Sequence, residues 1–254
     1  MTSPNGSLPA IVLAGAPAEP DMAEMHGIVN RADLPIAGRT MIQRIVDALI
    51  ASANVGEIVV IGDAACSGDL KRIESRGSLI DNLIAGAETC AEAARMLVCT
   101  SDIPAATAET IDDFVGRCAD YDADFFYPIV TKEDSERRFP GVKRTYAKMA
   151  EGTFTGGNIM LFSRRFILEN GDTIRSVAQN RKSIVGLARL LGIGVLLRVV
   201  LAQAVWPGAI TLADLEKVAG RILGARIKAV TTPMAEIAAD VDNLEQAADI
   251  ERCM

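Results

Sequence analysis

Asp102 is the residue of this sequence best placed to do chemistry. It follows the short apolar run 96–99 and comes two residues before Pro104. Such a run is typical of a strand buried on both faces of a parallel sheet, and the proline, which lacks an N–H, should end it. Ligands of open α/β sheets bind at the carboxyl ends of the strands, where a carboxylate can hold Mg²⁺ beside substrate phosphates. An equally favoured alternative is that Asp102 only caps the helix expected after Pro104.

A second group of candidate functional residues is basic. It lies in residues 132–148, although the chain as a whole is acidic. The segment has no clear period, so it is either a solvated loop or hairpin, or a lid or wall that meets an anionic substrate. Its basic residues include Arg137, Arg138, Lys143, Arg144 and Lys148. Shortly after it, Gly156 and Gly157 precede Asn158 at the start of an expected strand, which allows a ligand to approach the backbone closely.

The loop after the first expected strand, residues 8–14, is a third candidate. Gly15 and Ala16 follow that strand, and small residues at such an exit let backbone N–H groups approach phosphates. A single glycine is equally compatible with a structural turn.

Strands and helices that alternate along the chain must position these residues. Apolar spacing predicts a helix over 41–52 capped by Thr40, and short apolar runs predict buried strands. The alternation indicates an α/β fold that starts with a βαβ unit. The expected strands are 8–14, 57–61, 96–101, 124–130, 159–162 and 226–230. The other expected elements are one helical turn at 70–75, helices over 77–95, 107–118 and 244–251, mostly helical structure over 163–219, and an extended segment at 236–241.

Composition narrows the class of protein. The chain has 254 residues, half of them hydrophobic, which suffices for one large domain, and we expect a single domain over 1–254. A net charge of −7 without a basic block argues against nucleic-acid binding. Five cysteines without paired spacing indicate neither a zinc site nor disulfides, so we expect reduced thiols and a cytoplasmic location. Residues 1–7 contain no Lys or Arg, which a signal peptide carries at its start, so we expect no signal peptide.

Residues 184–205 are apolar enough to be mistaken for a membrane span. Arg189, Arg198 and Gln203 interrupt them, and a span needs about 20 predominantly apolar residues. We therefore expect no membrane contact, and helices that are either buried or form the face of a homodimer.

Five stretches in a specific order resemble the nucleotidyltransferases related to molybdenum-cofactor guanylyltransferase, the MobA-like NTP transferases. The stretches are 11–15, 30–41, 97–104 and 240–242 with the helix after it, and more loosely 155–158. The resemblance implies a GT-A-like α/β fold of the nucleotide-diphospho-sugar transferase type, with a mostly parallel central sheet flanked by helices. The apolar helices of about 163–223 are then a helical insertion.

The resemblance also implies a reaction. A phosphorylated small-molecule or cofactor acceptor attacks the α-phosphorus of a nucleoside triphosphate, and pyrophosphate leaves with the help of Mg²⁺ or Mn²⁺. Arg31 and Asp102 are then catalytic, and the metal ligands are Asp102 and Asp242, with Asp240 as a further candidate. The nucleotide-binding residues are Leu13, Ala14, Gly15, Ala16, Arg31, Ser78, Asn82 and Asp102. The acceptor-binding residues are Lys143, Arg144, Gly157, Asn158 and Lys182.

The first loop departs from the family pattern. In the family pattern, a second glycine and then an arginine come after the first glycine, whereas Ala16 and Pro17 follow Gly15 here. In addition, Glu19 and Asp21 occupy positions where phosphates are expected. The family lysine before Leu-Pro-Ile corresponds to Arg31. A second hypothesis is therefore a catalytically weakened nucleotide- or metabolite-binding protein on the same fold. The sequence does not determine which nucleobase the triphosphate carries. It also does not determine the acceptor, which is molybdopterin or an alcohol, polyol or sugar phosphate.

Overall fold

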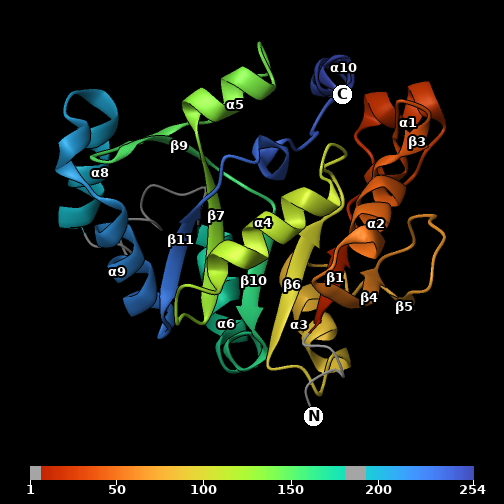
Figure 1. Ribbon diagram of the computed structural model, residues 1–254, viewed down its shortest axis with the longest axis horizontal. Helices are drawn as coiled ribbons and strands as arrows, with labels where there is room; N and C mark the ends of the chain where they lie inside the picture. The colour runs from red at the N-terminus through yellow and green to blue at the C-terminus, as the bar shows by residue number, and fades with distance from the viewer. Residues whose placement is uncertain (1–6, 181–192) are drawn as a thin grey trace.

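A nine-stranded sheet forms the centre of the molecule in the computed structural model, which describes residues 7–180 and 193–254 (Figure 1). Its order is β5-β4-β1-β6-β10-β7-β9-β8, and β11 pairs with β7. The pairings make all strands of this sheet run in one direction except β10 and β9. The expected α/β fold with a mostly parallel central sheet is therefore confirmed. The strands are β1 (Leu8–Leu13), β4 (Val55–Ile61), β5 (Lys71–Ile73), β6 (Arg95–Thr100), β7 (Phe125–Thr131), β8 (Ala147–Met149), β9 (Gly152–Gly156), β10 (Ile159–Ser163) and β11 (Ile227–Thr231), besides a small hairpin of β2 (Pro35–Ile36) and β3 (Arg39–Thr40).

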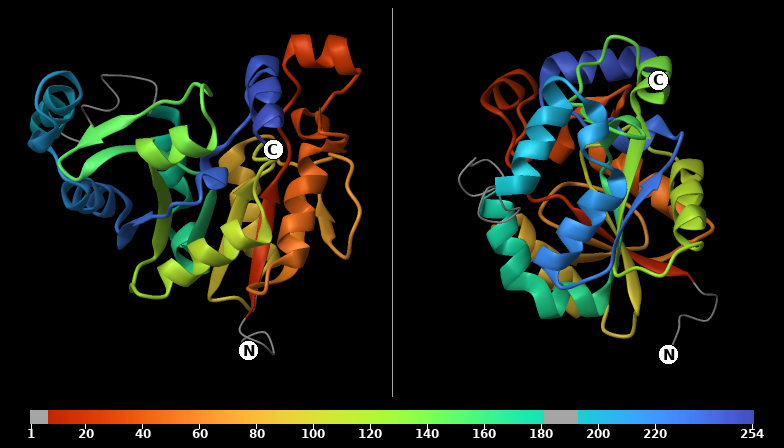
Figure 2. Two further views of the ribbon diagram at one scale, coloured as in Figure 1. Left: turned by 45° about the horizontal axis from the view of Figure 1, so that its top comes forward. Right: turned by 90° about the vertical axis from the view of Figure 1, so that its left-hand side faces the viewer.

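Helices cover both faces of this sheet. The α-helices are α1 (Pro20–His26), α2 (Met41–Ala51), α3 (Leu79–Thr89), α4 (Ala108–Cys118), α5 (Lys132–Arg138), α6 (Arg164–Asn180), α8 (Ile193–Ala204), α9 (Leu212–Leu223) and α10 (Leu244–Cys253). Short 3₁₀ turns are η1 (Arg31–Asp33), η2 (Pro207–Ala209) and η3 (Ala235–Ala238). Helices α2 and α4 pack together on one face, and α3 and α6 pack together on the other. Figure 2 shows the same layers from two further sides.

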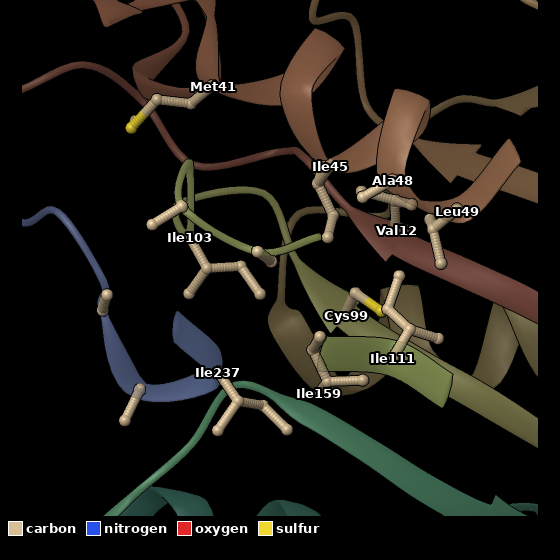
Figure 3. Packing of buried hydrophobic residues seen from close by; sticks show 14 of the residues in the cluster. Val12, Met41, Ile45, Ala48, Leu49, Cys99, Ile103, Ile111, Ile159 and Ile237 are labelled. Carbon is tan, nitrogen blue, oxygen red and sulfur yellow. The ribbon is translucent and has the colours of Figure 1, made fainter. Parts of the chain in front are cut away.

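Strand β1 explains why the sheet has a core on both faces. Its Ile11 belongs to the cluster under α3 and α6, whereas its neighbour Val12 belongs to the cluster under α2 and α4, and both side chains are fully buried. Figure 3 shows Val12 beside Ile45 and Leu49 of α2. Burying a side chain of this size contributes about 1.5–3 kcal/mol, so the apolar run at 10–13 fixes the strand at the centre of the sheet.

Side-chain caps fix where several helices begin. Thr40 accepts a hydrogen bond from the backbone N–H of the third helical residue of α2, as its position in the sequence predicts. Thr107, Thr211 and Asn243 cap α4, α9 and α10 in the same way. Because each cap satisfies an otherwise unpaired N–H, these polar residues mark the boundaries that apolar spacing alone leaves uncertain.

Three sequence-based expectations about local structure are wrong. Residues 71–73 form the edge strand β5 and not a helical turn, because they pair with β4. Residues 235–238 form the 3₁₀ turn η3 and not extended chain, and residues 132–138 of the charged segment form helix α5, capped by Thr131. The helix expected over 77–95 is shorter, since α3 covers only Leu79–Thr89.

The apolar segment at 184–205 is helical where the structure describes it, in α8. No helix within the described ranges combines the length and the apolar character of a bilayer crossing. Helix α8 and the residues just after it expose Leu197, Val200, Leu201, Val205 and Trp206. A homodimer through this face stays a prediction, which the mass in light scattering tests.

Candidate active site

Asp102 lies just past the carboxyl end of β6, as its sequence context predicts. The following helix begins at Ala108 under its own cap, Thr107, so Asp102 does not cap it. The backbone carbonyl of Asp102 accepts a hydrogen bond from the N–H of Val241 at 2.8 Å, which brings the distant acidic residues 240 and 242 to the same place. The loop that carries Asp102 rests on buried apolar side chains, among them Ile103 and Ile237 (Figure 3). Asp102 is only 8% exposed, so the packing around it holds the carboxylate in place.

Arg31 joins two of these acids with one guanidinium group. Its Nη2 lies 2.8 Å from Oδ2 of Asp102, and its Nη1 lies 2.9 Å from Oδ1 of Asp242. The Arg31 side chain is 21% exposed and that of Asp242 is 56% exposed, so the pair with Asp102 is the better shielded. The resemblance assigns both Arg31 and Asp102 to catalysis, and the structure places them in direct contact.

Asn30 determines where Arg31 lies, although sequence reasoning assigned it no role. Its side-chain amide donates to the carbonyl of Ala14 at 2.6 Å and to Oδ1 of Asp63 at 2.9 Å, and its Oδ1 caps η1 by accepting from the N–H of Ala32. The backbone N–H of Arg31 donates to the carbonyl of Ala16 at 3.0 Å. Asn30 is 5% exposed, so it ties the loop after β1 to the segment that carries Arg31. The signal for it in the sequence is a polar residue directly before Arg31.

The electrostatics of the site favour a bound cation. Burial raises the pKa of Asp102, the Thr100 hydroxyl and the Arg31 guanidinium oppose the shift, and the nearby carboxylates of Asp240 and Asp242 add to it. Oδ1 of Asp102 and Oγ1 of Thr100 are both buried, and neither has a hydrogen-bond partner of good geometry in the described part of the chain, although Thr100 lies close enough to lower the pKa of Asp102. A buried acceptor without a partner costs about 1–3 kcal/mol, so the site is arranged to gain from a further positive group.

A cavity of about 200 Å³ adjoins Asp102 and Arg31 on the side of β1 and α3. It is lined by Leu13, Gly15, Ala16, Pro17, Arg31, Gly77, Leu79, Asn82, Thr100, Ser101 and Asp102. Most of the expected nucleotide-binding residues are thus brought together. Ala14 is fully buried beside them, and Ser78 caps α3 between Gly77 and Leu79. Glu19 and Asp21 are not among the lining residues.

Two lining residues of this cavity have fixed positions. The amide of Asn82 accepts from the backbone N–H of Arg76 at 2.7 Å and donates to Oγ of Ser75 at 3.0 Å, so it holds the 75–77 loop in place. A Cβ at position 15 would lie 2.8 Å from that same Ser75 oxygen. Gly15 is therefore required for the close approach of the first loop to the 75–77 loop.

A second cavity, of about 580 Å³, lies on the other side of the acidic cluster. It is lined by Tyr127, Lys143, Arg144, Thr145, Thr155, Gly156, Gly157, Asn158, Asp240, Asp242 and Gln246. Four of the five expected acceptor-binding residues are therefore gathered here, and the fifth, Lys182, lies outside the described residues. Tyr127 is a lining residue that sequence reasoning missed.

The structure gives Asp240 and Asp242 different contacts and therefore different roles. Asp240 forms an ion pair with Arg144, accepts from Nδ2 of Asn158 at 3.3 Å, and its carbonyl accepts from Arg144 at 3.1 Å. Asp242 contacts only Arg31 through its carboxylate among the described residues. Asp242 is therefore the better partner for Asp102 at a metal, and Asp240 organises the wall of the second cavity.

The residues present fit a magnesium ion that is shared with a substrate. No group of three or more His, Cys, Asp or Glu side chains that could hold a metal by itself occurs within 7–180 and 193–254. Mg²⁺ bound with a nucleotide needs only one or two carboxylates, because phosphates and water supply its other ligands. Asp102, with its unpartnered oxygen, and Asp242 meet that requirement.

Comparisons with known proteins agree with this fold. A hypothetical transferase from Thermus thermophilus is 37% identical, with a TM-score of 0.85 over 95% of this chain and 99% of that one. A 4-diphosphocytidyl-2C-methyl-D-erythritol synthase from Anaerococcus prevotii shares the fold at 9% identity, with a TM-score of 0.58 over 98% of this chain and 96% of that one. A 2-C-methyl-D-erythritol 4-phosphate cytidylyltransferase from Thermus thermophilus shares it at 11%, with a TM-score of 0.53 over 95% and 96%.

No protein with a curated function matches the sequence. Residues 10–184, more than half of the chain, match the family described as MobA-like NTP transferase domain. These residues include the first loop, Arg31, Asp102 and the glycine pair of the second cavity. The chain belongs to this family of nucleotidyltransferases.

Proposed function

We propose that the protein transfers a nucleoside monophosphate from a nucleoside triphosphate to a small phosphorylated acceptor and releases pyrophosphate, with Mg²⁺ or Mn²⁺ as cofactor. The observation that carries the proposal is the position of Arg31 between Asp102 and Asp242, with one cavity on each side. Two substrates that enter these cavities meet at this cluster. Their charges are neutralised there, which is the main requirement of phosphoryl-type transfer.

The residues of the first cavity would hold the triphosphate. Gly15 and Ala16 present backbone to it, and the N-terminus of α3 begins at its wall, where backbone N–H groups favour an anion. Asp102 and Asp242 would hold the divalent cation, which supplies further neutralisation of the phosphates when bound. Arg31 would then exchange its carboxylate partners for oxygens of the α-phosphate, which its two-pronged guanidinium can contact together.

The acceptor would enter the second cavity with its phosphate towards Arg31. An oxygen of that phosphate attacks the α-phosphorus, the bond from the α-phosphorus to the bridging oxygen of the β-phosphate breaks, and pyrophosphate carries away the electron pair. The protein forms no covalent bond in this step. Its contribution is to align the two substrates and to neutralise charge as pyrophosphate leaves.

Pyrophosphate release tests the proposal directly. Each nucleoside triphosphate is incubated with Mg²⁺ or Mn²⁺ and a panel of sugar, polyol, alkyl and pterin phosphates. We expect release with one nucleotide and one acceptor class, and its loss in Asp102→Ala. Asp172→Ala is the matched control, because Asp172 is fully exposed on α6, away from both cavities. Unchanged turnover in Asp102→Ala would overturn the assignment.

One observation favours the second candidate, a binding protein with weakened catalysis. Pro17 has no N–H and lines the first cavity beside Ala16, so this loop offers fewer donors to phosphates than a glycine-rich one. This candidate predicts that the nucleotide binds without turnover. Restoring the loop with Ala16→Gly and Pro20→Arg should then raise affinity for the triphosphate, and no gain in affinity would count against this explanation.

A further inference from the structure

Gln246 lies in the first turn of α10 and holds the backbone of Asp242. Its Oε1 accepts a hydrogen bond from the N–H of Asp242 at 2.7 Å. Because an N–H group only donates, the end of the amide that meets it is the oxygen, and the NH₂ group is the other end. No hydrogen bond engages that NH₂ group in the described part of the chain. The bond to Asp242 is therefore the contact that fixes this side chain.

This bond is separate from the cap of α10. The cap is Asn243, whose Oδ1 accepts from the backbone N–H of Gln246 at 2.9 Å. A glutamine at the third position of a helix commonly reaches back to the N–H of the cap residue itself. Gln246 reaches one residue further, to Asp242, so its side chain does more than close the end of the helix.

Asp242 has few other contacts that could hold it. Its side chain is 56% exposed, and its carboxylate contacts only Arg31 among the described residues. Under the proposed function Arg31 turns to the α-phosphate, and the carboxylate then loses this contact. Its position then depends on two backbone hydrogen bonds, one from Val241 to the carbonyl of Asp102 at 2.8 Å and one from Asp242 itself to Gln246.

We propose that Gln246 is a positioning residue, which holds Asp242 beside Asp102 so that the two carboxylates can share the divalent cation. The proposal rests on the proposed function for the metal and adds the residue that fixes the more exposed of its two ligands. Side chains that orient metal ligands in this way are worth about ten- to hundredfold in metal affinity.

Hydrogen exchange followed by NMR tests the contact in the protein without ligands. Gln246→Met keeps the length of the side chain and removes the acceptor oxygen, whereas Gln246→Glu keeps an acceptor. We expect the amide of Asp242 to exchange about two- to tenfold faster in Gln246→Met, the worth of one hydrogen bond, and Gln246→Glu to restore the protection. An unchanged exchange rate in Gln246→Met would overturn the contact.

Calorimetry tests the consequence for the metal. The α,β-methylene analogues of the four common nucleoside triphosphates are titrated into the protein, once with Mn²⁺ and once with EDTA. We expect Gln246→Met to lower the gain in affinity that Mn²⁺ produces by about tenfold and to leave the affinity in EDTA unchanged. A gain equal to that of the wild type, or an equal loss of both affinities, would overturn the positioning role.

Gln43→Met is the matched control. The Oε1 of Gln43 accepts from the backbone N–H of Ser67 at 2.7 Å, the same kind of bond at the same length, and Gln43 lines neither cavity. It should leave the gain from Mn²⁺ unchanged, and a loss as large as that in Gln246→Met would contradict a specific role of Gln246. If no analogue binds to the wild type, the proposed function fails, and the exchange rate of the Asp242 amide still decides whether Gln246 holds this residue.

Discussion

Asp102→Asn should make the protein without ligands more stable at neutral pH while it removes the metal site. The carboxylate is buried, one of its oxygens has no partner, and its pKa is raised, so the folded state favours the uncharged form. Asparagine mimics that form. With its oxygen towards Arg31, the asparagine would place its N–H₂ group beside Thr100, whose buried Oγ1 also lacks a partner; relieving these buried atoms is worth about 1–3 kcal/mol, and replacing the charged contact to Arg31 by a neutral one loses about 1 kcal/mol. We therefore expect a net gain of about 1 kcal/mol, or about 2–4 °C in melting temperature for a chain of this size.

The pH dependence of this gain has a definite sign. A carboxyl group whose folded-state pKa is raised stabilises the fold below its ordinary pKa of 3.8 and loses that contribution as the pH rises through the folded-state pKa. The wild type should therefore approach Asp102→Asn in melting temperature as the pH falls from neutral towards 3.8. A less stable Asp102→Asn at pH 7.5, or a difference that does not shrink on acidification, would refute the reasoning.

Asp112→Asn is the matched control, with the opposite sign. Burial alone would raise the pKa of Asp112, but hydrogen bonds from Ser52 at 2.5 Å, from Asn54 at 2.8 Å and from backbone N–H groups hold it below its ordinary value. Asp112→Asn should therefore destabilise the protein at neutral pH, and the loss should fade only as the pH falls below about 4.

Three further substitutions test the framework around the site. Asn30→Ala should lower stability in urea unfolding by about 2 kcal/mol, because it leaves the buried carbonyl of Ala14 without its donor, and should weaken triphosphate binding; an unchanged midpoint would contradict its positioning role. Gly15→Ala should weaken calorimetric triphosphate binding at least tenfold, since its Cβ would meet Ser75, and full affinity would show that the loop can move aside. Thr40→Ala should cost about 1 kcal/mol through the lost cap and leave turnover unchanged, whereas a turnover loss larger than the stability loss would give this residue a second role.

Asp102 and Arg31 are predictable from the sequence because local signals place both. An apolar run that ends before a proline locates the end of β6, and the resemblance locates Arg31. Their contact with Asp242 is not a local property. It depends on the hydrogen bond between the backbone of Asp102 and that of Val241, across more than a hundred residues.

Which of Asp240 and Asp242 is the better metal ligand also depends on long-range contacts, so the structure is needed to decide it. An extended segment would place both on one face of the chain, since residues two apart share a face of a strand. Their ion pairs separate them, because Asp240 pairs with Arg144 and Asp242 with Arg31. The apolar pattern of residues 235–239 does not distinguish the 3₁₀ turn η3 from a strand.

Tyr127 was missed because it lies in a run that reads as a buried strand. Strand alternation offers a weak signal, since Phe126 and Pro128 are buried and Tyr127 between them is exposed. The sequence does not show which exposed strand residue faces a cavity. That depends on the pairing of β7 with β9, which places Gly156 beside the phenol.

The thermal shift produced by each nucleoside triphosphate, with and without Mg²⁺ or Mn²⁺, tests the central claim most directly. A ligand that binds only the folded protein stabilises it by about 2.7 kcal/mol at a hundredfold excess over its Kd. We expect a metal-dependent shift with one triphosphate, which is lost in Asp102→Asn and kept in Asp172→Ala. No shift with any triphosphate, or a shift that persists in Asp102→Asn, would contradict the assignment of Asp102 and Asp242 to a metal–nucleotide site.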